Sequence, residues 1–82
     1  MVTVEFGSHF EKQVKKIKDR QFKSQVKHHI IKIVNTPELG KPMKYSRKGT
    51  REVYIPPFRL SYMYIKTTDT FVFLELYHKD VQ

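Results

Sequence analysis

Three β-type segments in the second half of the chain are joined by connections short enough to be hairpins. Residues 51–55, 58–65 and 70–78 are rich in β-branched and aromatic side chains of alternating polarity, which predicts strands. Pro56-Pro57 separates the first two segments, and residues 66–69 separate the last two. Strands joined by so few residues pair antiparallel, because parallel pairing needs a long crossover. The second half is therefore predicted to be an antiparallel sheet.

The sequence of the first half of the chain predicts one short strand followed by two amphipathic helices. Residues 2–6 alternate in polarity, and a serine–glutamate capping box follows, with Ser8 as the N-cap. The first helix is expected to end near Arg20, and the second to run from near Gln21 to Asn35, where a Thr-Pro pair terminates it.

This order of elements predicts the fold class. Residues 43–46 add a possible short strand to the pattern β-α-α-β-β-β. Helices segregated from hairpin-linked strands indicate an α+β domain, in which two N-terminal helices pack on a twisted antiparallel sheet.

Length and composition predict one folded domain spanning residues 1–82. Hydrophobic residues make up 39% of the chain and aromatic residues 13%, which is more than a disordered tail contains. No apolar run approaches the roughly 20 residues of a membrane span, and the N-terminus lacks a secretion signal. Because the chain has no cysteine, neither disulfides nor thiolate–metal bonds can stabilise it. We expect a soluble cytoplasmic protein.

The excess of basic over acidic residues indicates the class of partner to expect. The chain has 16 Lys and Arg residues against 8 Asp and Glu residues, a net charge of +8. Such a field favours polyanions, meaning nucleic acid or an acidic protein. A generic lysine-rich surface gives the same total, so the placement of the charges matters more than their number.

Strand alternation places polar side chains on one face of the predicted sheet. The set expected to face the helices is Val53, Ile55, Phe58, Leu60, Tyr62, Tyr64, Val72, Leu74 and Leu76. The opposite face then carries Glu52, Tyr54, Arg59, Ser61, Glu75, Tyr77 and Lys79. A solvated sheet face needs no function, but tyrosines, cations and carboxylates converging on a few rungs favour a binding site.

A basic segment leads into the first of these strands. Residues 41–51 hold five Lys and Arg residues and no acid. Beside a polar sheet face such a segment suits a phosphate-binding rim; the alternative is a solvated loop. The predicted RNA-binding residues are Lys44, Arg47, Lys48 and Arg51, with Tyr77 for stacking on bases.

The element order and three short motifs resemble the RelE/ParE superfamily of type II toxins. The motifs are GKPMKYSRKGTREVYI at 40–55, FRLSY at 58–62 and TFVFLELYHKD at 70–80. Members carry a Lys-x-Leu-like segment with a glycine, a YRLVY-type strand and a last strand that ends in a His/Lys-Arg-like pair. The likeness spans nearly the whole chain.

That resemblance implies a fold, two alternative activities and a set of partners. The fold is two N-terminal helices over a twisted antiparallel sheet, related to microbial ribonucleases. RelE-type members cut mRNA in the ribosomal A site without a metal, whereas ParE-type members inhibit DNA gyrase. Both are neutralised by an antitoxin that wraps around the toxin. The implied partners are therefore a cognate antitoxin and, for the RelE type, the ribosome and mRNA.

The resemblance also assigns roles to single residues. Arg59 matches the arginine that contacts the scissile phosphate in RelE-type toxins, and Lys79 falls where the family often has a second arginine. His78 falls where many members have His or Lys. Glu52 and Tyr54 occupy strand positions at which RelE has two lysines, so this chain departs from RelE there.

Cleavage of RNA through its own 2′-hydroxyl needs a proton acceptor, stabilisation of charge on the phosphoryl oxygens, and a proton for the leaving oxygen. Arg59 suits the second role, because a guanidinium binds phosphate bidentately and stays charged. Glu52, Glu75 and His78 remain open for proton transfer, although alternation puts His78 on the helix side. The alternative is that both glutamates only pair with Arg59 and Lys79 across the sheet.

No metal or cofactor is expected, since the sequence has no cysteine and no His-x-x-x-His spacing. The adjacent His28 and His29 point about 100° apart on a helix and do not form a chelating pair. Three functions remain open: a RelE-type endoribonuclease, a ParE-type gyrase inhibitor, and a catalytically silent relative that binds RNA or an antitoxin.

Overall fold

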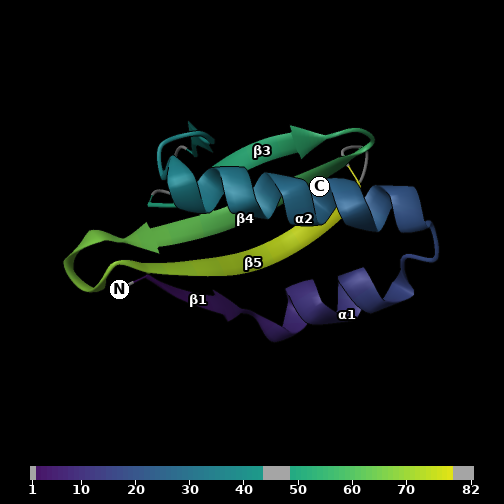
Figure 1. The fold of residues 1–82 in the computed structure, drawn as a ribbon, viewed down its shortest axis with the longest axis horizontal. Coiled ribbons are helices and arrows are strands. Elements are labelled where there is room, and N and C mark those ends of the chain that lie inside the picture. The colour runs from purple at the N-terminus through teal and green to yellow at the C-terminus, as the bar shows by residue number, and fades with distance from the viewer. Residues whose placement is uncertain (1, 44–48, 79–82) are drawn as a thin grey trace.

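The computed structural model describes residues 2–43 and 49–78. These residues form two α-helices on one face of a five-stranded sheet, which confirms the α+β architecture (Figure 1). The strands are β1 (Thr3–Phe6), β2 (Lys41–Pro42), β3 (Arg51–Ile55), β4 (Phe58–Ile65) and β5 (Thr70–His78), and the helices are α1 (Ser8–Lys16) and α2 (Arg20–Asn35). A 3₁₀ turn at Lys66–Thr68 joins β4 to β5. Neither described helix is long and apolar enough to cross a membrane.

The sheet is mixed, so the prediction of an antiparallel sheet was wrong for one strand. The strand order is β1-β5-β4-β3-β2, and neighbouring strands pair antiparallel except for β1 and β5. These two run parallel, from Thr3 opposite Thr70 to Phe6 opposite Phe73. Parallel pairing is possible because the two helices after β1 supply the required crossover. The local pattern of a four-residue strand does not specify its partner.

The start of α1 differs from the predicted capping box. Gly7, not Ser8, is the N-cap, and no side chain caps the helix there. The Gly7 N–H donates to the Phe73 carbonyl oxygen at 2.8 Å. A Cβ atom on Gly7 would lie 3.2 Å from the same oxygen. Strand β1 therefore passes directly into α1 at a point where the backbone lies tightly against β5.

The connection between the helices is set by Asp19. Its carboxylate accepts from the N–H groups of Gln21 and Phe22 at 2.9 and 3.3 Å, which makes Asp19 the N-cap of α2. Helix α1 consequently ends at Lys16, earlier than the predicted end near Arg20, and α2 begins within one residue of its predicted start. Helix α2 ends at Asn35, as the Thr-Pro pair predicts.

The core lies between the helices and the covered face of the sheet. Helix α2 runs roughly along the strands in front of β4, and α1 follows β1 at the edge of the sheet (Figure 1). Aromatic contacts join the two layers, with ring centroids 5.9 Å apart for Phe10 and Phe73 and 5.0 Å apart for Phe22 and Phe58. The buried hydrophobic residues are Phe10, Phe22, Val26, Ile33, Ile55, Leu60, Tyr62, Phe71, Phe73 and Leu76.

A bulge interrupts the ladder between β4 and β5. Ser61 pairs with Glu75, but the next residue, Tyr62, pairs with Phe73. Leu74 is therefore an additional residue on β5 without a direct counterpart on β4. An additional residue reverses which face the side chains on one side of it occupy.

The bulge corrects the prediction for the core side of β5. Alternation assigned Val72 and Leu74 to the helix side, but both are only partly buried. Phe71 and Phe73 are fully buried in their place. On the C-terminal side of the bulge Leu76 is buried in the core, as predicted.

Tyr62 holds the loop that follows α2. Its hydroxyl donates to the Pro37 carbonyl and accepts from the Gly40 N–H, both at 2.9 Å. Arg51 Nη1 donates to the Gly40 carbonyl at 2.7 Å. A Cβ atom on Gly40 would lie 2.8 Å from the Tyr62 ring, so a larger residue here would displace the ring.

This loop places β2 earlier than the sequence predicts. Strand β2 is Lys41–Pro42, and Met43 lies beyond it, with its N–H donating to the Thr50 carbonyl at 2.9 Å. The remainder of the predicted short strand, residues 44–46, lies outside the described residues.

Candidate nucleic-acid interface

A buried carboxylate and a guanidinium meet on the sheet face opposite the helices. Glu52 on β3 faces Ser61 on β4, and Tyr54 faces Arg59 two rungs along, on the same face. Arg59 Nη1 donates to Glu52 Oε1 at 2.7 Å. The Glu52 side chain is 8% exposed and that of Arg59 is 39% exposed, so the pair consists of a buried carboxylate and a partly exposed guanidinium.

Two tyrosines complete this cluster. Tyr77 on β5 faces Arg59, and its hydroxyl donates to Glu52 Oε2. Both oxygens of the Glu52 carboxylate are therefore engaged, one by Arg59 and one by Tyr77. The Arg59 guanidinium carbon lies 5.8 Å from the centroid of the Tyr54 ring, within the range of a cation–π contact. We call these four residues, Glu52, Tyr54, Arg59 and Tyr77, the open-face cluster.

The cluster keeps Arg59 charged and oriented. Its hydrogen bond to Glu52 raises the pKa of the guanidinium, and the attraction of the same carboxylate adds to the effect. Nε of Arg59 is buried and has no hydrogen-bond partner among the described residues. The exposed part of the guanidinium can meet an anion from solvent, while Glu52 fixes its plane.

The other residues proposed for proton transfer lie on different sides of β5. Glu75 is opposite Ser61 on the open face, next to the cluster. His78 is opposite Phe58, and the two rings contact with centroids 5.5 Å apart. Phe58 packs on α2, so His78 lies on the helix side, as alternation predicts, and away from Arg59.

The basic rim is described only in part. Arg51 alternates with Glu52, so it lies on the opposite face from Arg59, and its guanidinium binds the carbonyl oxygens of Glu38 and Gly40 at 3.4 and 2.7 Å. The other predicted cations, Lys44, Arg47, Lys48 and Lys79, lie outside the described residues. Their roles stay predictions.

Two lysines and a histidine that were not among the predicted site residues lie beside the cluster. Lys32 and His29 on α2, together with Lys41 on β2, line a hollow of about 470 Å³ that also reaches Glu52, Tyr54 and Arg59. Lys41 belongs to the basic segment 41–51 that predicts a phosphate-binding rim, and the structure places it directly opposite Glu52. The helical residues carry no such signal in the sequence, because their place depends on how α2 packs beside β3.

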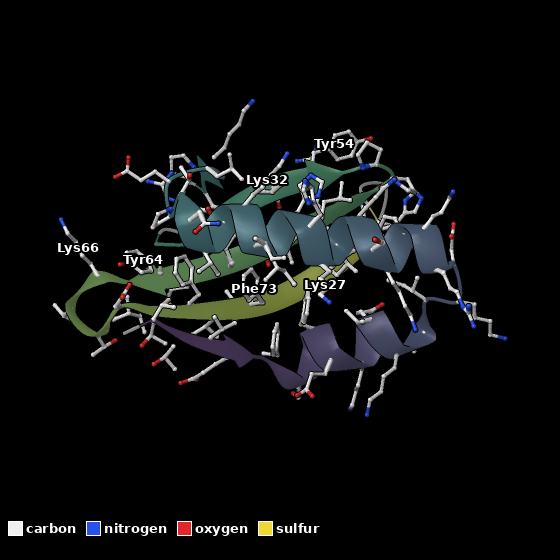
Figure 2. All side chains as sticks on the ribbon, viewed as in Figure 1. Lys27, Lys32, Tyr54, Tyr64, Lys66 and Phe73 are labelled. Carbon is white, nitrogen blue, oxygen red and sulfur yellow. The ribbon has the colours of Figure 1, made fainter. Side chains whose placement is uncertain are left out.

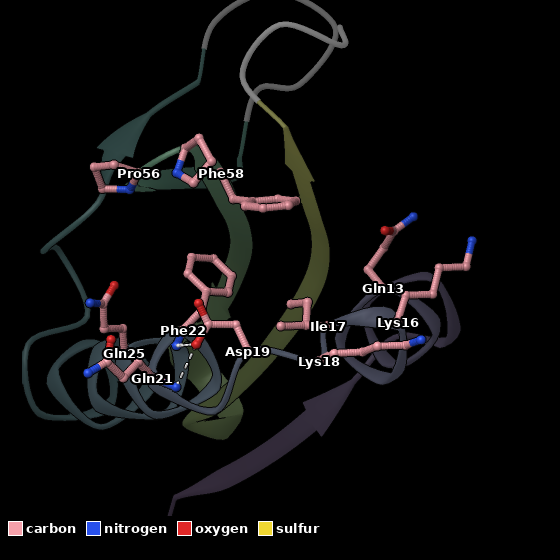
Figure 3. A pocket seen from close by; sticks show the side chains of 11 residues that line it. Gln13, Lys16, Ile17, Lys18, Asp19, Gln21, Phe22, Gln25, Pro56 and Phe58 are labelled. Atoms are coloured by element: carbon pink, nitrogen blue, oxygen red, sulfur yellow. Dashed lines mark hydrogen bonds between the residues drawn. The ribbon is translucent and has the colours of Figure 1, made fainter.

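A separate hollow of about 460 Å³ opens between the helical connection and the Pro56-Pro57 turn (Figure 3). Phe22 and Phe58 lie in its wall, and the dashed bonds mark Asp19 capping α2. None of the predicted site residues lines this hollow. Among the described residues there is also no group of three or more His, Asp or Glu that could hold a metal ion. We therefore place the candidate site at the open-face cluster.

Comparison with solved structures places this fold among bacterial toxins. The toxin chain of the intact Escherichia coli RelBE toxin–antitoxin complex superposes with a TM-score of 0.80 at 12% identity, covering 95% of this chain and 96% of that chain. The RelBE2 toxin–antitoxin complex from Mycobacterium tuberculosis gives a TM-score of 0.80 at 24% identity, covering 95% and 98%. The YoeB/ParE toxin from Agrobacterium tumefaciens gives 0.82 at 14% identity, covering 94% and 98%.

Sequence comparison supplies the family. No curated protein sequence matches the chain. The sequence model of the ParE toxin of the type II toxin–antitoxin system parDE matches residues 4–81, nearly the full length. The resemblance predicted from the three motifs is thereby confirmed. The chain belongs to the ParE toxin family and is the toxin of a type II toxin–antitoxin system, with the fold of RelE.

Proposed function

We propose that this toxin is a metal-independent, ribosome-dependent endoribonuclease that cuts mRNA and stops translation. The observation that carries the proposal is the open-face cluster, in which a half-exposed Arg59 is oriented by the buried Glu52. A cation held in a fixed plane on a solvated sheet face is suited to bind a phosphodiester. Tyr54, which is 49% exposed, offers an aromatic surface beside it for an unstacked base.

Each residue of the cluster can be assigned a separate role in the cleavage step. Arg59 binds the scissile phosphate through the part of its guanidinium that Glu52 does not use, and it stabilises the charge that develops on the phosphoryl oxygens. Glu52 is the carboxylate in contact with Arg59, and this makes it our candidate acceptor of the 2′-hydroxyl proton. Tyr77 holds the second carboxylate oxygen and so sets the orientation of Glu52.

The leaving 5′ oxygen takes its proton from solvent water, and Glu52 returns the 2′ proton to solvent afterwards. Lys44 keeps the RNA-binding role predicted from the sequence, and Lys79, which follows His78 in the chain, keeps the place of the family's second arginine. In this assignment His78 has no direct role, because its ring packs on Phe58.

The proposal is tested by mapping mRNA 5′ ends in a purified translation system with the wild-type toxin and with Arg59→Ala. We expect translation-dependent cuts with wild type and a rate lowered by roughly 100- to 1,000-fold in the variant. Arg20→Ala, at an exposed position at the start of α2, is the matched control and should cut like wild type. Equal cleavage by Arg59→Ala, with both variants folded, would refute the site.

Gyrase inhibition is the second candidate function, and the matching family model favours it, since that model describes a ParE toxin. In that case the open-face cluster would be part of a protein-binding surface, and no mRNA would be cut. Inhibition of DNA supercoiling by the purified toxin, together with intact mRNA in the translation system, would select this function over cleavage.

A cognate antitoxin is the expected protein partner, since two of the similar structures are toxin–antitoxin complexes. A groove of about 500 Å³ between α1 and α2 suits an amphipathic acidic helix. Its floor includes Val14 and Val26, and Lys15, Lys23 and Lys27 stand at its rim. Lys23→Glu/Lys27→Glu should reduce retention of the co-expressed antitoxin. Unchanged retention would place the antitoxin on another surface.

A further inference from the structure

We propose that the hollow beside β3 binds the phosphate next to the scissile one in single-stranded RNA, through Lys32 and Lys41. This inference rests on the proposed function, because it extends the path of the RNA strand that Arg59 is proposed to hold. We call the hollow, with Lys32, Lys41, His29 and Tyr54 in its wall, the edge hollow.

Cations from three separate elements converge on the edge hollow. Lys32 comes from α2, Lys41 from β2 and Arg59 from β4. Within the described part of the chain neither lysine forms an ion pair. Glu52 is the acidic side chain among the described residues that line the hollow, and both of its oxygens are already engaged. The hollow therefore has an uncompensated positive charge, which favours an anion.

The hollow continues directly from the proposed scissile-phosphate site. Lys41 is opposite Glu52 in the β2–β3 ladder, and Glu52 is bonded to Arg59. The backbones of β2 and β4 lie on either side of β3, two strand spacings or about 10 Å apart, and both Lys41 and Arg59 line the hollow. One extended nucleic-acid strand can thus place consecutive phosphates at the two cations.

Aromatic surface in the hollow favours a nucleotide over an acidic peptide. Tyr54 is 49% exposed, and Arg59 lies over its ring. A base stacked on this ring would have its flanking phosphates near Arg59 on one side and Lys41 on the other. Such stacking needs an unpaired base, so the ligand is a single strand rather than a duplex.

His29 adds a directed polar group to the wall. Its Nδ1 lies 2.8 Å from the Gln25 carbonyl oxygen, which can only accept, so Nδ1 carries the hydrogen. Nε2 is then the acceptor of the neutral ring, and it is the ring atom left to accept a hydrogen bond from a base or ribose group in the hollow. Figure 2 shows Lys32 on the side of α2 that faces β3 and Tyr54, and Lys27 on the side that faces α1.

The test measures affinity for a labelled single-stranded 2′-O-methyl RNA, which cannot be cleaved, over a series of salt concentrations. For single strands the slope of log affinity against log salt is about −0.7 per phosphate contact. Because both lysines are proposed to hold the same phosphate, Lys32→Gln/Lys41→Gln should make the slope shallower by about 0.7. Both lysines are exposed, so the variant is expected to fold.

The matched control is Lys15→Gln/Lys27→Gln, which removes the same charge from the groove between the helices. It should leave the slope unchanged. An equal change in both variants, no change in the first, or no RNA binding at low salt would each overturn the inference. So would a loss of poly-glutamate binding in Lys32→Gln/Lys41→Gln with RNA affinity kept, since the ligand would then be an acidic protein.

The outcome is separable from that of the proposed function. If the slope changes as expected but translation-dependent cleavage is absent, the edge hollow binds RNA and the proposed nuclease activity fails. If cleavage depends on Arg59 and the slope is unchanged, the nuclease stands and the edge hollow is not its second phosphate site.

Discussion

The two faces of β4 are built from neighbouring residues but follow opposite rules. On the helix side Leu60 and Tyr62 are fully buried, and the hydroxyl of Tyr62 is satisfied by backbone groups. On the open face the side chain of Arg59 is 39% exposed and its partner is the charged Glu52. The helix side thus depends on volume and shape, whereas the open face depends on charge and orientation.

This difference teaches where stability and function can be separated. Buried apolar area accounts for most of the folding free energy of a small domain. Half-exposed ion pairs contribute little to it. We therefore expect substitutions on the helix side to unfold the protein, and substitutions on the open face to change activity at nearly constant stability.

The largest expected effect on stability is at Phe73, which is fully buried and contacts Phe10 and Tyr62. Phe73→Ala should lower the free energy of unfolding by about 3–5 kcal/mol, through lost burial and the cavity left behind. Urea denaturation measures this change. Val72→Ala, on the same strand but partly exposed on the other face, should cost much less. Equal costs would contradict the bulged register.

The next effect is at Glu52 and should appear in activity. Glu52→Gln keeps the shape and can still accept from Arg59, so we expect a loss of only about 1 kcal/mol in unfolding free energy. If Glu52 takes the 2′ proton, mRNA cleavage should fall by roughly 100-fold or more. Glu75→Gln, on the same face and across Ser61 from Glu52, is the control.

Cleavage measured alongside thermal unfolding distinguishes the two roles of Glu52. Loss of activity at a nearly unchanged melting temperature supports proton transfer. Full activity in Glu52→Gln would leave Glu52 only the role of holding Arg59 in place.

Much of the fold could be predicted because its signals are local. The bounds of β3, β4 and β5 follow from alternation and short turns, and the facing of Glu52, Tyr54, Arg59 and Tyr77 follows from the same pattern. The placement of these four residues on one face could therefore be predicted from the sequence, although their roles could not.

The parts that could not be predicted depend on contacts distant in sequence. The bulge at Leu74 has no signature in β5 itself, since both facings bury apolar residues. The parallel pairing of β1, and the presence of Lys32 and Arg59 in the wall of one hollow, arise only when α2 and β1 pack on the sheet. For the same reason the N-cap at Gly7 replaced the expected one, because contact with β5 outweighs a local capping preference.

The smallest expected effect concerns the hydroxyl of Tyr62, a polar group on the helix side of β4. Burial raises the pKa of Tyr62 above its ordinary value of 10.0. A group whose pKa is raised on folding contributes stability that is complete below the unfolded value and is lost as pH rises through the folded value. The wild-type free energy of unfolding should therefore decline above about pH 10.

Tyr62→Phe removes this dependence together with the bonds to Pro37 and Gly40. At pH 8 we expect it to be about 1 kcal/mol less stable than wild type, and at pH above 10 the difference should shrink. Tyr64, whose pKa is raised by its hydrogen bond to Asp69, keeps part of the alkaline decline in the variant. Urea denaturation of both proteins at the two pH values measures the gap. A gap that widens with pH would mean that folding lowers the pKa of Tyr62 instead of raising it, and that the helix side also depends on charge.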